Sequence, residues 1–135
     1  MTSERLERRN SIKTLWLLAI PLFALHAIEE YFFSFPSQDP LIKLFSAYLH
    51  LDTLSIFFIL QIFLGILLIV PLFVGFKRWW NLIIGIILVS ELEHIAMSVS
   101  LREYYPGFYT SIFLVILGIF FWRELLKTKT HVNGS

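Results

Sequence analysis

Four long runs of apolar residues alternate with short polar segments along the chain, at about residues 12–35, 51–76, 79–101 and 106–126. Each run matches the ~20 residues that an α-helix needs to cross the ~30 Å hydrocarbon core of a bilayer. The sequence therefore predicts an all-α, polytopic membrane protein with four transmembrane helices in a bundle over residues 12–126. Residues 1–11 form a polar segment before the bundle, and residues 127–135 form a polar tail after it.

A shorter apolar stretch from Leu41 to Leu49 separates the first two runs. Asp39 and Pro40 precede it and form a typical helix start, because an N-cap residue is followed by proline in the first turn. A continuous helix from Pro40 to Phe76 would be ~55 Å long, which is too long for one crossing. We therefore expect a short interfacial helix, a break near His50–Asp52 and a cap that starts the second span.

Composition supports a membrane setting. Of the 135 residues, 57% are hydrophobic and 16% are charged, whereas soluble domains average ~45–50% apolar and ~25% charged residues. The lipid bilayer is therefore the expected partner, and a lipid-soluble small molecule and a homo-oligomer are compatible with this composition. The net charge of +1 gives no field that would attract nucleic acid. The absence of cysteine excludes disulfides, thiolate metal ligands and cysteine nucleophiles.

Basic and aromatic residues are distributed unequally between the two ends of the predicted spans. Of the 11 Lys and Arg residues, only Lys43 and Arg102 fall on the side opposite to the termini. The positive-inside rule therefore places both termini in the cytoplasm. The four Trp lie towards the predicted cytoplasmic ends and the five Tyr towards the opposite ends, as expected for interfacial aromatic belts.

Two of the apolar runs contain histidine and glutamate. In the first run, His26, Glu29 and Glu30 are neighbours on a helical surface. In the third run, Glu91 and His94 are three residues apart and share a face, while Glu93 points elsewhere. Because the first and third spans run in the same direction, the two histidines should lie at similar depth. The sequence therefore predicts that two His/carboxylate pairs meet inside the bundle.

Ionisable groups in such a position require compensation. A charged residue at the centre of a bilayer costs ~2.5–3.5 kcal/mol on insertion scales, unless it pairs, is protonated or binds an ion. Histidine and carboxylate ligands without cysteine suit Zn, Fe or Mn, and Glu-x-x-His is a local ligand pattern of di-metal carboxylate bundles. We expect a divalent metal with ligands His26, Glu29, Glu30, Glu91 and His94. Glu30 or Glu93 would be left as a catalytic base.

Further polar residues lie towards the same end of the predicted bundle. A substrate pocket there could include His50, Asp52, Gln61, Tyr105 and Tyr109. Each of them also has a simpler interpretation, as a helix cap, an interhelical hydrogen-bond residue or a member of the aromatic belt.

The run His26-Ala27-Ile28-Glu29-Glu30 resembles the signature of the HXXEE-domain family of small integral membrane proteins. The later His94, and Tyr105-Pro106-Gly107 followed by Thr110, are similar to the downstream pattern of that family. The resemblance covers roughly residues 12–125. It implies a small membrane protein of uncharacterised activity in which His26, Glu29, Glu30 and His94 are candidates for metal binding or catalysis. It supplies no substrate.

Four functions are compatible with these observations. We favour a membrane metalloenzyme that acts on a lipid-soluble or membrane-embedded substrate. A metal-free His/Glu acid–base catalyst, such as an isomerase, is the main alternative. A proton or cation transport component is a third, although four spans are few and the half near the termini is nearly all apolar. The fourth is an accessory protein whose polar cluster only holds the bundle together.

Overall fold

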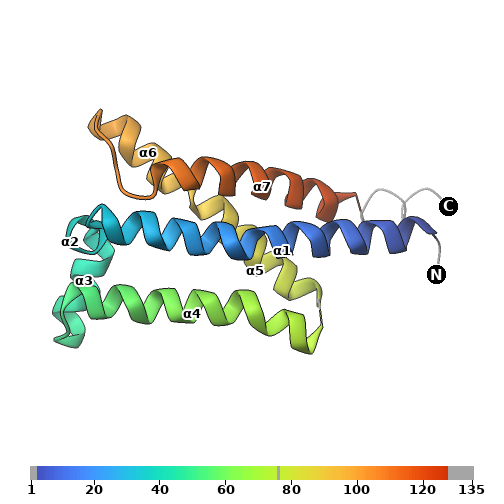
Figure 1. The fold of residues 1–135 in the computed structure, drawn as a ribbon, viewed down its shortest axis with the longest axis horizontal. Helices are drawn as coiled ribbons and strands as arrows, with labels where there is room; N and C mark the ends of the chain where they lie inside the picture. Colours follow the sequence, from blue (N-terminus) through green and yellow to red (C-terminus); the bar gives the residue numbers. More distant parts are fainter. Residues whose placement is uncertain (1–2, 76, 128–135) are drawn as a thin grey trace.

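The computed structural model describes residues 3–75 and 77–127, which form an antiparallel arrangement of helices (Figure 1). In chain order the helices are α1 (Ser3–Phe32), α2 (Phe35–Gln38), α3 (Pro40–Leu49), α4 (Thr53–Val74), α5 (Arg78–Ser90), α6 (Leu92–Leu101) and α7 (Phe108–Leu126). Helix α1 contacts both α4 and α7, and α7 also contacts α5 and α6. The two described ends of the chain lie at the same end of the bundle. The predicted tail lies outside the described residues apart from Lys127.

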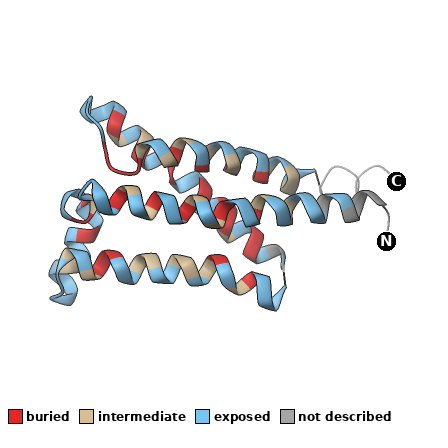
Figure 2. Ribbon diagram, viewed as in Figure 1, coloured by how far each residue is buried: buried red, intermediate tan, exposed pale blue. Residues whose placement is uncertain are grey.

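Four segments are long and apolar enough to cross a membrane: Arg9–Phe32, Thr53–Val74, Trp79–Leu101 and Phe108–Leu126. A shorter apolar helix, Pro40–Leu49, lies between the first two. The prediction of an all-α, four-span architecture with one short additional helix is therefore confirmed. Large apolar residues such as Phe63, Ile86 and Phe113 are exposed, and Figure 2 shows exposed positions along all of the long helices. Such a surface suits lipid rather than water and indicates a multi-pass membrane protein.

The break between the first two spans follows from local chain chemistry. The Asp39 carboxylate caps α3 by accepting a hydrogen bond from the Ile42 N–H at 2.8 Å. His50 ends α3 in the left-handed conformation, with φ 56°. Asp52 then caps α4 by accepting from the Ser55 N–H at 2.9 Å. The predicted break near His50–Asp52 is thus confirmed, and of the two caps that the sequence allows, Asp52 or Thr53, the structure has Asp52. The first long helix ends at Phe32, slightly earlier than predicted, because Ser34 adopts a left-handed conformation.

The third span is interrupted at Glu91, between α5 and α6, which the sequence did not predict. The Ser90 hydroxyl donates to the Ile87 carbonyl at 2.7 Å. In an uninterrupted helix that carbonyl would accept from the N–H of Glu91, so a local side-chain bond competes with the helical one. The Glu91 N–H instead bonds to the Val89 carbonyl. The interruption releases Glu91 from the regular helix at the level of the polar cluster.

The half of the bundle near the termini is filled by an apolar core. Its buried members are Trp16, Ala19, Phe23, Leu68, Trp80, Ile84, Leu88, Leu114 and Phe121. Trp16 is 0% exposed, and its indole Nε1 donates to the Leu68 carbonyl at 2.8 Å. Trp122 donates to the Gly85 carbonyl at 2.8 Å. These two tryptophans therefore join neighbouring helices. Trp16 lies inside the bundle, and the interfacial aromatic belt stays a prediction.

Candidate metal centre

The first helix contributes His26 and Glu30, which face the interior of the bundle one turn apart. They are 4% and 3% exposed, and four residues of separation put them on one side of α1. The distance between His26 Nε2 and Glu30 Oε1 is 3.4 Å. Glu29 is only half-buried, since the adjacent position is rotated by ~100° around the helix axis. The two neighbouring glutamates therefore have different surroundings.

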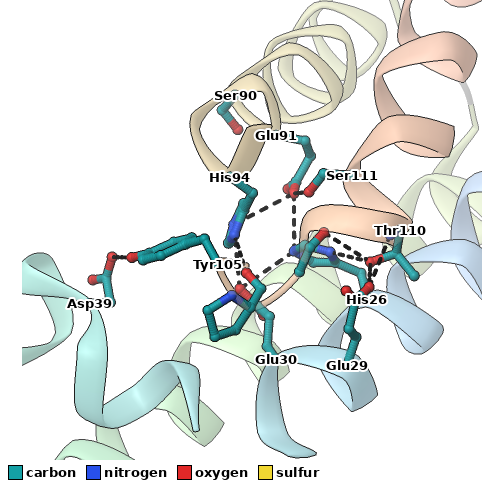
Figure 3. A network of polar contacts seen from close by, with 12 residues as sticks. His26, Glu29, Glu30, Asp39, Ser90, Glu91, His94, Tyr105, Thr110 and Ser111 are labelled. Atoms are coloured by element: carbon teal, nitrogen blue, oxygen red, sulfur yellow. Dashed lines mark hydrogen bonds and ion pairs between the residues drawn. The ribbon is translucent and has the colours of Figure 1, made fainter. Parts of the chain in front are cut away.

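The helix interruption contributes Glu91, and the first turn of α6 contributes His94; both are buried. Glu91 Oε2 lies 3.0 Å from His26 Nε2 and 3.8 Å from His94 Nε2. Glu30 Oε1 lies 3.5 Å from His94 Nε2. Figure 3 shows these side chains from α1 and α6 pointing towards one another. The predicted meeting of two His/carboxylate pairs is confirmed by these distances.

The arrangement has the dimensions of a metal site. The ligand atoms of His26, Glu91 and His94 all lie within 4.8 Å of one another, and the two imidazole rings are nearly perpendicular, with centroids 4.9 Å apart. A tetrahedral ion with ligand bonds of ~2.0–2.2 Å separates its ligand atoms by ~3.4 Å. This buried His/Glu/His group could therefore hold a metal ion, and Glu30 adjoins it.

The other ring nitrogen of each histidine is also engaged. His94 Nδ1 lies 2.6 Å from the Pro106 carbonyl oxygen, and His26 Nδ1 lies 2.8 Å from the Thr110 hydroxyl. Glu91 Oε2 accepts from the Ser111 hydroxyl at 3.2 Å. Buried metal-binding histidines usually have such a partner on the second nitrogen, which fixes the ring and its tautomer.

Gly107 lies close to both histidine rings. A Cβ atom at this position would be 2.6 Å from His26 Cε1 and 2.8 Å from His94 Nδ1. Its φ of +88° is also in the left-handed region, which disfavours other residues. The close approach of the loop to both imidazoles therefore depends on glycine.

Glu29, predicted as a ligand, binds the start of α7 instead of the cluster. Its Oε1 accepts from the Tyr109 N–H at 3.1 Å and the Tyr104 hydroxyl at 2.6 Å. Its Oε2 accepts from the Thr110 N–H at 2.9 Å and the Thr110 hydroxyl at 2.6 Å. A carboxylate at this position satisfies amides that have no partner in the first helical turn and complements the helix dipole.

Gln61 and Tyr105 occupy the surroundings of the cluster. Gln61 Nε2 donates to Glu30 Oε2 at 2.8 Å, which holds that carboxylate from α4. The Tyr105 hydroxyl donates to Asp39 Oδ2 at 3.3 Å. Burial, together with the neighbouring Asp39 carboxylate, raises the pKa of Tyr105 above its usual range. Tyr105 is thus a neutral donor that ties the loop after α6 to the start of α3.

The remaining predicted residues lie outside the cluster. Glu93 is exposed, and within residues 3–75 and 77–127 its side chain makes no hydrogen bond or ion pair. His50 and Asp52 are exposed at the junction of α3 and α4. Tyr109 is exposed, and its ring stacks on Tyr104 with centroids 5.5 Å apart.

Ser111 was missed by the sequence analysis, although it is 0% exposed and bonds to Glu91. Its position carried a signal, because Ser111, Leu114, Gly118 and Phe121 follow helical spacing along the buried stripe of α7. A hydroxyl on an apolar stripe indicates a polar partner on the facing helix.

The fold and the cluster define a small multi-pass membrane protein with a buried His/Glu group between its helices. The family model described as "Protein of unknown function with HXXEE motif" matches residues 16–121, so the chain belongs to the HXXEE family. The motif itself is His26-Ala27-Ile28-Glu29-Glu30. No curated protein and no solved structure matches the chain.

Proposed function

We propose that this protein is a membrane metalloenzyme in which His26, Glu91 and His94 hold a divalent cation. The observation that carries the proposal is the orientation of the two imidazoles. Both Nε2 atoms face the carboxylates of Glu30 and Glu91, at 3.0 to 3.8 Å, while both Nδ1 atoms are occupied by other oxygen partners.

The positions of the hydrogens on the two imidazole rings show why this orientation suits a cation. The Pro106 carbonyl can only accept, so His94 Nδ1 carries a hydrogen. The single hydroxyl hydrogen of Thr110 has two acceptors, Glu29 Oε2 at 2.6 Å and the Gly107 carbonyl at 3.3 Å, and the shorter contact favours Glu29. With either acceptor, the Thr110 oxygen accepts from His26 Nδ1. In a neutral imidazole the Nε2 lone pair then faces a carboxylate oxygen, which is repulsive. A cation between these atoms converts the repulsion into coordination.

Charge balance is consistent with a divalent ion. Glu30 and Glu91 carry two negative charges if both are ionised, and neutral imidazoles add none. One divalent cation then makes the buried group neutral, as low-dielectric surroundings require, and protonation of both imidazoles is the metal-free way to reach the same balance. The mixed nitrogen and oxygen ligand set, without sulfur, suits Zn, Fe or Mn.

A catalytic role is supported by the number of ligands. Two histidines and one glutamate form a set that leaves a fourth position open, as in catalytic zinc sites. A divalent cation in such a site supplies Lewis acidity and activates water. Glu30 adjoins the set, and Gln61 holds its second oxygen, so we assign Glu30 as the general base. Glu93 is left out of this assignment because it is exposed.

The position of the cluster within the candidate membrane spans supports a lipid-soluble or membrane-embedded substrate. His26 and Glu30 belong to the candidate span Arg9–Phe32, and Glu91 and His94 belong to Trp79–Leu101. A substrate must therefore reach groups that lie within the apolar segments. We retain the positive-inside orientation, which puts both termini in the cytoplasm and the site towards the opposite side.

Metal analysis of the purified protein tests the proposal. Protein prepared in detergent without chelator should contain about one divalent metal ion per chain, and His26→Ala should lose it. His50→Asn is the matched control, because His50 is exposed and asparagine tolerates the left-handed conformation. A folded wild-type protein that binds none of Zn, Fe or Mn, even when titrated with them, would contradict the proposal.

A second measurement addresses catalysis. Wild-type protein is incubated with a total lipid extract, and the products are analysed by mass spectrometry. Glu30→Gln should retain the metal and lose the conversion. Conversion that persists after complete removal of the metal would instead favour a metal-free acid–base catalyst.

A further inference from the structure

One short segment touches both histidines. It consists of the end of the loop between α6 and α7 and the first turn of α7, residues 104–110, and we call it the orienting segment. The Pro106 carbonyl accepts from His94 Nδ1 at 2.6 Å, and the Thr110 hydroxyl lies 2.8 Å from His26 Nδ1. Two imidazoles that come from different helices are therefore oriented by seven consecutive residues.

The orienting segment is also packed directly against the rings. Gly107 lies so close to them that an added Cβ would be 2.6 Å from His26 and 2.8 Å from His94. The rings cannot rotate towards the loop without displacing its backbone. Interior positions of this kind transmit small displacements, because packed side chains have little free volume.

Glu29 anchors the orienting segment to α1. Its carboxylate accepts four hydrogen bonds from Tyr104, Tyr109 and Thr110, at 2.6 to 3.1 Å. The bond from the Thr110 hydroxyl fixes the direction of its hydrogen and leaves the oxygen to accept from His26. A continuous series of hydrogen bonds thus runs from the Glu29 carboxylate through the Thr110 hydroxyl to His26 Nδ1.

We propose that Glu29 and Thr110 are positioning residues for the metal site, and that the two glutamates of the HXXEE motif have separate roles. Glu30 faces the site, whereas Glu29 fixes the tautomer and ring orientation of His26 through Thr110. This inference rests on the proposed metal site and extends it, because it assigns no ligand role to Glu29. Partners of metal-bound histidines typically change metal affinity by ~10- to 100-fold when they are removed.

Cobalt provides the test, because its visible spectrum reports the ligand geometry. Thr110→Val removes the hydroxyl at nearly constant volume, and Thr110→Ser retains it. We expect Thr110→Val to weaken Co²⁺ binding by ~10- to 100-fold and to change the visible absorption bands, with Thr110→Ser close to wild type. Glu29→Gln should alter the spectrum in the same direction.

A matched control separates positioning from stability. Ser98 also bonds to the orienting segment, because its hydroxyl oxygen accepts from the Tyr105 N–H at 2.8 Å. Within the part of the chain that the structure describes, this hydroxyl makes no hydrogen bond to either imidazole. Ser98→Ala should lower the melting temperature of the metal-free protein and leave the cobalt spectrum unchanged. If Thr110→Val and Ser98→Ala behave alike, with wild-type cobalt affinity and spectrum, the positioning role is refuted.

A metal-free readout distinguishes the two proposals. In protein labelled with ¹⁵N-histidine, the wild-type His26 ring should be protonated at Nδ1, and Thr110→Val should change its tautomer. If wild-type protein binds no cobalt but shows this change, the metal site fails, whereas the control of the His26 ring by Thr110 stands. If it binds cobalt and the tautomer is insensitive to Thr110→Val, the positioning role fails alone.

Discussion

The end of the bundle near the chain termini and the end with the His/Glu cluster hold their helices together differently. At the terminal end, apolar side chains fill the interior, and two indole N–H groups donate to backbone carbonyls of neighbouring helices. At the other end, His26, Glu30, Glu91 and His94 form a buried polar group, with Glu29, Thr110 and Ser111 bonded around it.

The terminal end shows that this chain can associate its helices without ionisable side chains. Each ionisable group at bilayer depth costs ~2.5–3.5 kcal/mol on insertion scales, whereas interhelical hydrogen bonds in membranes average only ~0.6 kcal/mol. A cluster of four such groups is therefore an expensive way to achieve what packing achieves elsewhere in the molecule. This difference favours a chemical role for the polar end over a purely structural one.

Phe121→Ala should give the largest loss of stability among the tests of this comparison. Phe121 is 0% exposed, and its ring lies 6.3 Å from that of Trp16. Removing it leaves a cavity in the apolar core, so the free energy of unfolding should fall by about 3–5 kcal/mol. Denaturation in detergent micelles measures this, and metal analysis of the same sample should show unchanged metal content.

Phe120 supplies the control for that experiment, because it is the neighbouring residue on α7 and is 50% exposed. Phe120→Ala should change stability far less. A loss of metal in Phe121→Ala protein that remains folded would show that the two ends are coupled, and the comparison between them would have to be abandoned.

Most of what was predictable from sequence depends on one helix at a time. Run lengths predicted the four spans, and a helix longer than the bilayer required the break that Asp52 caps. The meeting of His26 with Glu91 needed two further steps. Counting residues gave equal depth in two parallel spans, and the cost of exposing ionisable groups to lipid placed both polar faces inside the bundle.

Two features of the site were not predictable. One depends on a choice between two hydrogen bonds of nearly equal energy, and the other depends on which helix lies opposite. The interruption at Glu91 depends on whether the Ile87 carbonyl accepts from the Ser90 hydroxyl or from a backbone N–H. These two hydrogen bonds differ little in energy. Helical spacing placed Glu29 beside His26 on α1, but it does not reveal that the start of α7 lies opposite. The distinction between Glu29 and Glu30 therefore required the tertiary structure.

A smaller effect is expected for Trp122→Phe at the terminal end. The substitution removes the hydrogen bond from Nε1 to the Gly85 carbonyl at 2.8 Å and keeps an aromatic ring over Gly85. The expected loss is about 0.6 kcal/mol, the average for interhelical hydrogen bonds in membranes. Denaturation in micelles measures it, with Trp79→Phe as the exposed control. A loss of several kcal/mol would mean that hydrogen bonds, and not packing, hold this end together.

The smallest effect is expected at Asp52, an acidic residue at the polar end that lies outside the cluster. The hydroxyl and the backbone N–H of Ser55 hold the pKa of Asp52 below its ordinary value. A lowered pKa in the folded state contributes stability at pH values above the ordinary one, and that contribution is lost as the pH falls through the folded-state pKa. The exposed position of Asp52 keeps the effect small.

Asp52→Ser isolates this contribution, because serine is also an N-cap residue but does not ionise in this range. The stability of wild type minus that of Asp52→Ser should be constant near neutral pH and should shrink as the pH is lowered below about 4. Taking the difference removes every contribution to the pH dependence that both proteins share. The comparison is repeated in a His50→Asn background, because His50 lies at the same junction. A difference that still changes between about pH 5 and 8, the usual range for histidine, would show that the junction of α3 and α4 is coupled to the cluster. Asp52 would then have to be counted with the site and not with the helix caps.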